Sequence, residues 1–98
     1  MKRLSDAEIR RFHDDGLVIP DYRLPAAMLA RMQAEVDRLI ERNPGVRPEQ
    51  LSGAHNPWGQ SAQMVGSQTF LDLCLFPEIL DMVEQLIGPD IVLWGSQL

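Results

Sequence analysis

The sequence lacks the features that mark several large classes of protein. It has a single cysteine among its 98 residues, Cys74, which excludes an internal disulfide and fits a reducing compartment. No apolar run approaches the roughly 20 residues that a membrane-spanning helix needs. Met1–Arg3 is followed at once by the polar Ser5–Glu8, so the apolar core of a signal peptide is missing there. These absences predict a cytoplasmic protein without a membrane partner.

Basic residues are missing from the second half of the chain. All nine Lys and Arg residues lie at or before Arg47, whereas six acidic residues and no basic ones follow. The earlier basic residues alternate with acidic ones, as is usual on a solvated helix face. A face that binds nucleic acid needs clustered positive charge to neutralise phosphates. Since the formal net charge is −5 and no such cluster is present, we expect no nucleic-acid partner.

Apolar periodicity predicts three helices, over about 6–15, 25–42 and 77–87. Ser5 and Glu8 have the spacing of a capping box at the start of the first helix. Gly16 suits the left-handed backbone conformation that ends this helix. Pro25 and Pro77 suit the first positions of the other two helices, where a missing N–H is no loss.

Side chains on the second helix are expected to form local ion pairs. Arg31 with Glu35, and Glu35 with Arg38, lie at the sequence spacing that allows pairing on one helix face. Further along, Thr69 is predicted to cap a short turn of helix that reaches Cys74. Because Cys74 lies among apolar residues and has no basic neighbour in sequence, we interpret it as a small hydrophobe.

Two runs of β-forming residues predict short strands at about 17–19 and 91–97. Ile91–Trp94 is an unbroken apolar run bounded by turn residues, which favours a strand buried on both faces. Ser96 and Gln97 follow as polar residues, which either complete a hydrogen-bond network or face a cavity. Between the helices, residues 44–67 lack periodicity and predict a long loop, of the kind that is usually functional or mobile.

The two histidines are the first candidates for metal chemistry. His13 and Asp15 have the H-x-D spacing of a facial iron site. They fall in the last turn of a predicted helix, where residues two apart point in different directions and cannot share an ion. His55 has no Cys, Asp or Glu cluster beside it, so it either lines a pocket or lies in a surface loop held by a buried Trp58. We assign no metal ligand and no catalytic residue.

The order of these features resembles the N-terminal part of the phytanoyl-CoA dioxygenase family, which are non-haem Fe(II), 2-oxoglutarate-dependent oxygenases. The resembling stretches are LSDAEIRRFHDDGLVIPDYRLPAAMLARMQAEVDRLI, HNPWG and FLDLCLFPEILDMVEQLIGPDIVLWGSQL. In that family a capped helix leads through a glycine to an aliphatic strand, and a helix that starts at proline follows. After a loop comes a helix that ends in LxGPD and leads into a strand.

This resemblance implies an α+β fold, in which the helices pack outside a double-stranded β-helix (jelly roll). The predicted strands 17–19 and 91–97 would begin its sheets. Residues 1–98 would then be the N-terminal part of a single dioxygenase domain, since such a barrel needs about 200–250 residues. In the family, the iron ligands and the basic residue that binds 2-oxoglutarate follow this region. The chain alone is therefore expected to bind neither Fe(II) nor 2-oxoglutarate.

The resemblance also implies part of a substrate and cosubstrate pocket. Gln97 corresponds to a glutamine that can face this cavity in relatives. Trp94 lies on the same predicted strand, where alternation turns Trp94 to one face and Gln97 to the other, and the sequence leaves open which face is inward. His55 and Trp58 lie where relatives build the mouth of the cavity. The function implied is the N-terminal segment of an oxygenase that hydroxylates a small organic substrate, with the remainder of its own domain as partner. The alternative is a free-standing helical protein-interaction module without catalytic activity.

Overall fold

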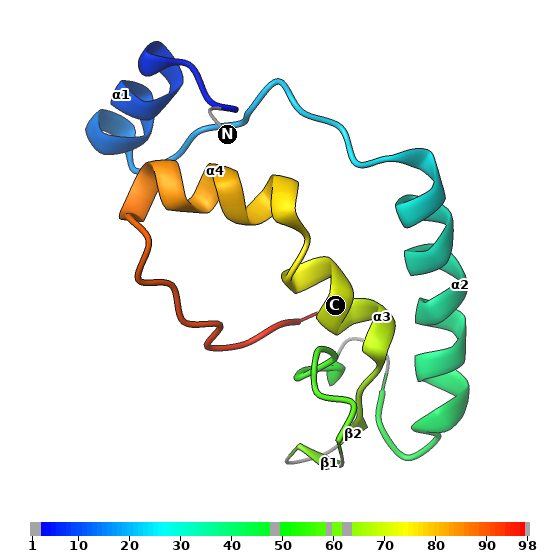
Figure 1. Ribbon diagram of the computed structural model, residues 1–98. Coiled ribbons are helices and arrows are strands. Elements are labelled where there is room, and N and C mark those ends of the chain that lie inside the picture. The colour runs from blue at the N-terminus through cyan, green and yellow to red at the C-terminus, as the bar shows by residue number, and fades with distance from the viewer. Residues whose placement is uncertain (1–2, 48–49, 59, 62–63, 98) are drawn as a thin grey trace. The chain divides into compact units, whose positions relative to one another are not determined.

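The computed structural model describes residues 3–47, 50–58, 60–61 and 64–97 (Figure 1). Its elements in chain order are α1 (Asp6–Asp15), α2 (Ala26–Arg42), β1 (Gln60–Ser61), β2 (Met64–Val65), α3 (Gln68–Cys74) and α4 (Pro77–Ile87). The chain divides into two compact units. The first is made of Met1–Arg23 and Leu75–Val92, and the second of Leu24–Cys74 and Leu93–Leu98. Three of the helices match the three long helices that the periodicity predicts, except that α2 begins at Ala26, with Pro25 as its N-cap rather than in its first position.

The first unit contains α1 and α4, which pack against each other (Figure 1). The predicted capping box opens α1: the Ser5 hydroxyl accepts the Glu8 N–H at 3.1 Å, and the Glu8 carboxylate accepts the Ser5 N–H at 3.2 Å. Gly16 ends the helix with a φ of 74°, in the left-handed region that glycine reaches without steric cost. Both ends of α1 are therefore formed by local sequence.

The second unit has its core between α2, α3 and the loop that joins them. Leu39 of α2 and Phe70 of α3 are buried together with Leu51 and Ala54 of the loop. Four partly buried side chains pack around this cluster: Met32, Val36, Val46 and Leu73. The apolar stripe of α2 thus faces α3, and Figure 1 shows the two helices side by side. Burial of these side chains supplies the hydrophobic stabilisation of the unit.

The long loop is held by hydrogen bonds between its two halves. The Gly66 N–H donates to the Asn56 carbonyl at 3.1 Å, and the Ser67 N–H donates to the Ala54 carbonyl at 2.8 Å. Ser67 also caps α3, because its hydroxyl accepts the Phe70 N–H at 3.2 Å. The predicted cap at Thr69 is therefore wrong by two residues, and α3 begins at Gln68.

Charged side chains on α2 pair across the fold as well as along the helix. Glu35 contacts Arg38 and Arg42, with N–O distances of 3.5 Å in both pairs. The predicted partnership of Glu35 with Arg38 is therefore present. Arg31 instead contacts Asp72 of α3 at 3.3 Å. Helical spacing allows a pair between Arg31 and Glu35. Arg31 contacts the Asp72 carboxylate instead, because the packing of α3 on α2 brings that carboxylate close.

The predicted α+β fold with the opening strands of a jelly roll is contradicted by this structure, which is helical. Residues 17–19 form no strand, and Leu17 and Ile19 are exposed. Residues 91–97 form no strand either, apart from a single antiparallel bridge between Gln97 and Ser52. Among the described residues, the strands that do form are β1 and β2, an antiparallel pair with two residues in each strand, inside the loop. A β-forming run becomes a strand only where neighbouring backbone offers hydrogen bonds along it.

Several apolar side chains that were expected to be buried are exposed. Val92 is 87% exposed and Trp94 is 97% exposed, so the run from Ile91 to Trp94 is not covered on both faces. Trp58 is 79% exposed, although a tryptophan in a loop gains from burial. Hydropathy shows which side chains gain from burial, but a covering surface must be present before they are buried.

Candidate small-molecule pocket

An open pocket of about 700 Å³ lies in the second unit, between the loop and the C-terminal segment. The loop contributes Ser52, Gly53, His55 and Asn56, and the C-terminal segment contributes Trp94, Gly95, Ser96 and Gln97. Gly53 turns the loop here with a φ of 74°, and its carbonyl accepts the Asn56 N–H at 3.0 Å. The turn brings His55 back toward the C-terminal segment.

Ser96 is the residue that joins the two walls of the pocket. Its carbonyl accepts the Gly53 N–H at 2.8 Å, and its hydroxyl accepts the His55 backbone N–H at 3.1 Å. The same hydroxyl lies 2.5 Å from Nδ1 of the His55 ring. The sequence suggests two alternative roles for Ser96, and Ser96 has both in the structure. It completes a hydrogen-bond network, and it lines a cavity.

The structure brings together three of the four side chains that the sequence assigned to a pocket. His55, Trp94 and Gln97 all line it, whereas Trp58 does not. The backbone N–H of Trp58 donates to the Asn56 side chain at 3.2 Å, while its own ring is exposed. Sequence reasoning missed Asn56, because an Asn before a Pro reads as an ordinary turn residue.

Within the part of the chain that the structure describes, the lining of the pocket has polar groups but no Asp, Glu, Lys or Arg. Its hydrogen-bonding groups are the imidazole of His55, the amides of Asn56 and Gln97, and backbone groups. The exposed ring of Trp94 adds an apolar face at the edge. Pockets for small molecules combine such apolar surface with a few convergent polar groups. The arrangement suits hydrogen bonding and ring stacking rather than charge pairing.

The described residues do not fit an iron centre. Within residues 3–47, 50–58, 60–61 and 64–97, no group of three or more His, Cys, Asp or Glu side chains could hold a metal ion. His13 and Asp15 lie in the last turn of α1, as expected, and the His13 ring contacts Phe12 edge to face. We therefore derive no chemical step through iron from the side chains of this chain.

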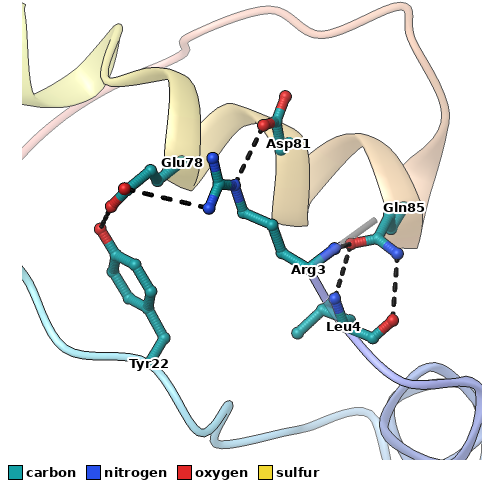
Figure 2. Close-up of polar contacts among 6 residues, drawn as sticks. All are labelled: Arg3, Leu4, Tyr22, Glu78, Asp81 and Gln85. Atoms are coloured by element: carbon teal, nitrogen blue, oxygen red, sulfur yellow. Dashed lines mark hydrogen bonds and ion pairs between the residues drawn. The ribbon is translucent and has the colours of Figure 1, made fainter. Parts of the chain in front are cut away.

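A second polar cluster, in the first unit, fastens the N-terminal segment to α4 (Figure 2). The Arg3 guanidinium contacts Asp81 at 3.0 Å and Glu78 at 3.9 Å, and the Tyr22 hydroxyl donates to Glu78 at 2.5 Å. Burial, followed by the hydrogen bond to Glu78 and its negative charge, raises the pKa of Tyr22 to about 12. The groups of this cluster are paired with one another, which indicates a structural role.

The backbone of the N-terminal segment is held to α4 by one amide side chain. Gln85 Oε1 accepts the N–H groups of Arg3 at 2.9 Å and Leu4 at 2.8 Å, and Gln85 Nε2 donates to the Leu4 carbonyl at 3.1 Å (Figure 2). The Leu4 side chain is only 2% exposed. Gln85 thus satisfies these backbone groups, as a neighbouring strand does in a sheet.

The half-buried thiol of Cys74 lies at the C-terminal end of α3. Burial raises the pKa of Cys74, which disfavours the thiolate. Because the thiolate is the nucleophilic form of cysteine, this environment argues against nucleophilic chemistry at Cys74.

Comparisons with known proteins leave the resemblance resting on the sequence pattern. No protein-family model matches the chain, and the searches of curated proteins and of solved structures found no match. In the part of the chain that the structure describes, no helix has both the length and the apolar character needed to cross a membrane.

Proposed function

We propose that this chain forms part of the substrate-binding wall of a non-haem Fe(II)/2-oxoglutarate-dependent oxygenase that hydroxylates a small organic molecule. The observation that carries the proposal is the pocket. His55 and Gln97, which the family resemblance assigns to a pocket, line one cavity together with Trp94, whereas Trp58, the third residue that the resemblance assigns there, does not line it. His55 and Ser96, which join its walls, are 41 positions apart in the sequence. Only folding brings them together.

The role of this chain in the proposed reaction is confined to binding and orienting the substrate. The family resemblance implies that the iron ligands and the 2-oxoglutarate site come from residues outside this chain. Iron and the oxoacid together would supply the oxidant. That the chain alone binds no Fe(II) stays a prediction, and stoichiometric, EDTA-sensitive binding of Fe(II) would contradict it. The cytoplasmic location likewise stays a prediction from the sequence.

The proposal is tested by measuring oxidative decarboxylation of 2-oxoglutarate by the protein that the natural gene encodes. The purified protein is supplied with Fe(II) and 2-oxoglutarate, and succinate formation is measured with and without a panel of uncharged alcohols and amides. We expect slow succinate formation that some members of the panel stimulate. A gene product that forms no succinate under any of these conditions would exclude an active oxygenase.

Two tryptophan variants locate the substrate within that assay. Trp94→Ala removes an apolar face of the pocket and is expected to raise the KM for the stimulating compound, while succinate formation without it stays unchanged. Trp58→Ala is the matched control, because Trp58 is also exposed but does not line the pocket. Equal effects of the two substitutions would argue against substrate binding in this pocket.

A helical interaction module is the second candidate, and exposed apolar side chains favour it. Leu17 and Ile19 in the first unit, and Trp58 and Trp94 in the second, present large apolar surfaces to solvent. Surfaces of this kind often mark sites of protein association. A sharp thermal transition with a mass that does not depend on concentration would favour a self-sufficient module. Aggregation, or secondary structure without fixed tertiary packing, would count against it.

A further inference from the structure

We propose that Ser96 holds His55 as the neutral tautomer with its proton on Nε2, and thereby prepares the pocket for an uncharged ligand that presents an oxygen acceptor. The inference concerns the ligand class of the same pocket, and in that respect it rests on the proposed function. Ser96 is a positioning residue in this proposal, since it acts on the ligand through the His55 ring. The argument begins with the hydrogen bonds of the Ser96 hydroxyl.

The Ser96 hydroxyl has one proton to donate and two lone pairs to accept with. One lone pair is occupied by the backbone N–H of His55, which cannot act as an acceptor. The remaining contact of the hydroxyl is with Nδ1 of the His55 ring, at 2.5 Å. Among the described residues, no other acceptor for the hydroxyl proton is in contact. Donation of this proton to an unprotonated Nδ1 keeps it within the protein, whereas an Nδ1–H that donated to the second lone pair of the hydroxyl would leave the hydroxyl proton to solvent.

An unprotonated Nδ1 places the proton of a neutral imidazole on Nε2. Within the described part of the chain, Nε2 of His55 has no hydrogen-bond partner, and the residue is half-buried in the pocket lining. The pocket therefore offers an N–H donor with a defined orientation. Its natural counterpart on a ligand is a carbonyl or hydroxyl oxygen.

The remaining lining selects against charge on that ligand. The side-chain carbonyl of Asn56 accepts the Trp58 N–H, and the amide group of Asn56 supplies N–H donors. Among the described residues, no Lys or Arg lines the pocket to compensate a carboxylate, and no Asp or Glu lines it to compensate an ammonium group. A charged ligand would lose hydration without gaining an ionic partner, which is costly. An amide or alcohol attached to a flat apolar group, which can lie on Trp94, fits these constraints.

Nitrogen NMR of the histidine side chains tests the tautomer directly. The chain has two histidines, and His13 on α1, which is exposed, serves as the internal reference. The spectra are recorded at mildly alkaline pH. We expect His55 as a single Nε2–H tautomer, His13 as a tautomer mixture, and Ser96→Ala to convert His55 to a mixture. Ser96→Thr, which keeps the hydroxyl, should restore the single tautomer.

A wild-type His55 with the same tautomer mixture as His13 would overturn the proposal, as would an Nδ1–H tautomer. This measurement on the wild-type chain needs no variant, so it decides the question even where Ser96→Ala fails to fold. It also needs neither iron nor 2-oxoglutarate. A missing tautomer signature combined with normal succinate formation would therefore reject the role of Ser96 and leave the oxygenase proposal standing. The expected tautomer without succinate formation would support the role of Ser96 and reject the oxygenase proposal.

Benzamide and benzoate form the matched pair of probes for the ligand class. They share the phenyl ring and the carbonyl oxygen but differ in charge. We expect benzamide to shift the His55 Nε2 resonance and quench Trp94 fluorescence, which is isolated by measuring in a Trp58→Phe background. Ser96→Ala should weaken benzamide binding about tenfold, the loss expected when one hydrogen bond is no longer oriented. Benzoate binding as strongly as benzamide, or benzamide failing to perturb His55, would overturn the assignment of ligand class.

Discussion

The side chain of Asn43 pairs with the backbone of Val65 as a neighbouring strand would. Asn43 Oδ1 accepts the Val65 N–H at 2.8 Å, and Nδ2 donates to the Val65 carbonyl at 3.1 Å. The same Nδ2 donates to the Leu39 carbonyl in the last turn of α2 at 2.8 Å. Asn43, only 6% exposed, therefore ends α2 and holds the strand β2 with one amide group.

Replacing Asn43 with Ala should lower the free energy of unfolding of the second unit by about 1–3 kcal/mol, because the part-buried N–H and carbonyl of Val65 lose this side-chain partner and the Leu39 carbonyl keeps only the Asn43 N–H. Urea denaturation followed by circular dichroism measures the change. Gln33→Ala, on the exposed surface of α2, is the control and should have little effect. If Asn43→Ala were as stable as the control, the amide would not be what holds β2.

The Gly66→Ala variant should also be destabilised. An added Cβ would lie 2.4 Å from the Asn56 carbonyl oxygen and 2.7 Å from that of Ala54, both backbone atoms that cannot rotate away. Overpacking of this kind typically costs about 1–3 kcal/mol. Gly45→Ala is the control, because a Cβ there meets nothing within 4 Å. Equal midpoints of thermal unfolding for the two variants would contradict this packing of the loop.

Gln85→Ala should release the N-terminal segment from α4. The substitution removes the partner of three backbone groups, those of Arg3 N–H, Leu4 N–H and Leu4 C=O. We expect the Leu4 amide to exchange with solvent much faster, since its protection depends on this one side chain. Glu84→Ala, a neighbouring exposed position on α4, is the matched control. Unchanged exchange at Leu4 in Gln85→Ala would show that other contacts hold the segment.

The pKa of Tyr22 predicts a loss of stability at alkaline pH. The folded state retains the phenol proton up to a pKa of about 12, whereas the unfolded chain releases it at the ordinary value of 10.0. Between these values the folded state binds more protons than the unfolded state, so the free energy of unfolding falls as pH rises. Tyr22 is the only tyrosine, which allows its ionisation to be followed by tyrosinate absorbance.

The control for this titration is Tyr22→Phe, which should remove the part of the alkaline loss that lies in this window. Below pH 10 the variant should be somewhat less stable than the wild type, since the hydrogen bond to Glu78 is lost. A native-state tyrosinate midpoint near the ordinary value would contradict both the burial of the phenol and its pairing with Glu78.

Local sequence was sufficient to predict the helices and most of their ends. The capping box of Ser5 and Glu8 and the left-handed Gly16 depend on residues within one turn of each other, so short-range spacing identifies them. The same holds for α4, whose start at Pro77 and stop before Gly88 follow from the backbone properties of those residues. The choice of His55 and Gln97 as pocket residues came from the family resemblance, whereas Trp94 was chosen for its place on the run that leads to Gln97.

Contacts between distant segments decided the remaining features. Ile91–Trp94 has the composition of a buried strand, but strand formation depends on backbone partners that composition does not reveal. Arg31 contacts Asp72 because α3 packs on α2, and helical spacing contains no information about that packing. The pocket exists because Ser96 meets His55 across 41 positions of sequence. Periodicity and capping report interactions within a few residues, whereas strands, ion-pair partners and cavities depend on what lies opposite in space.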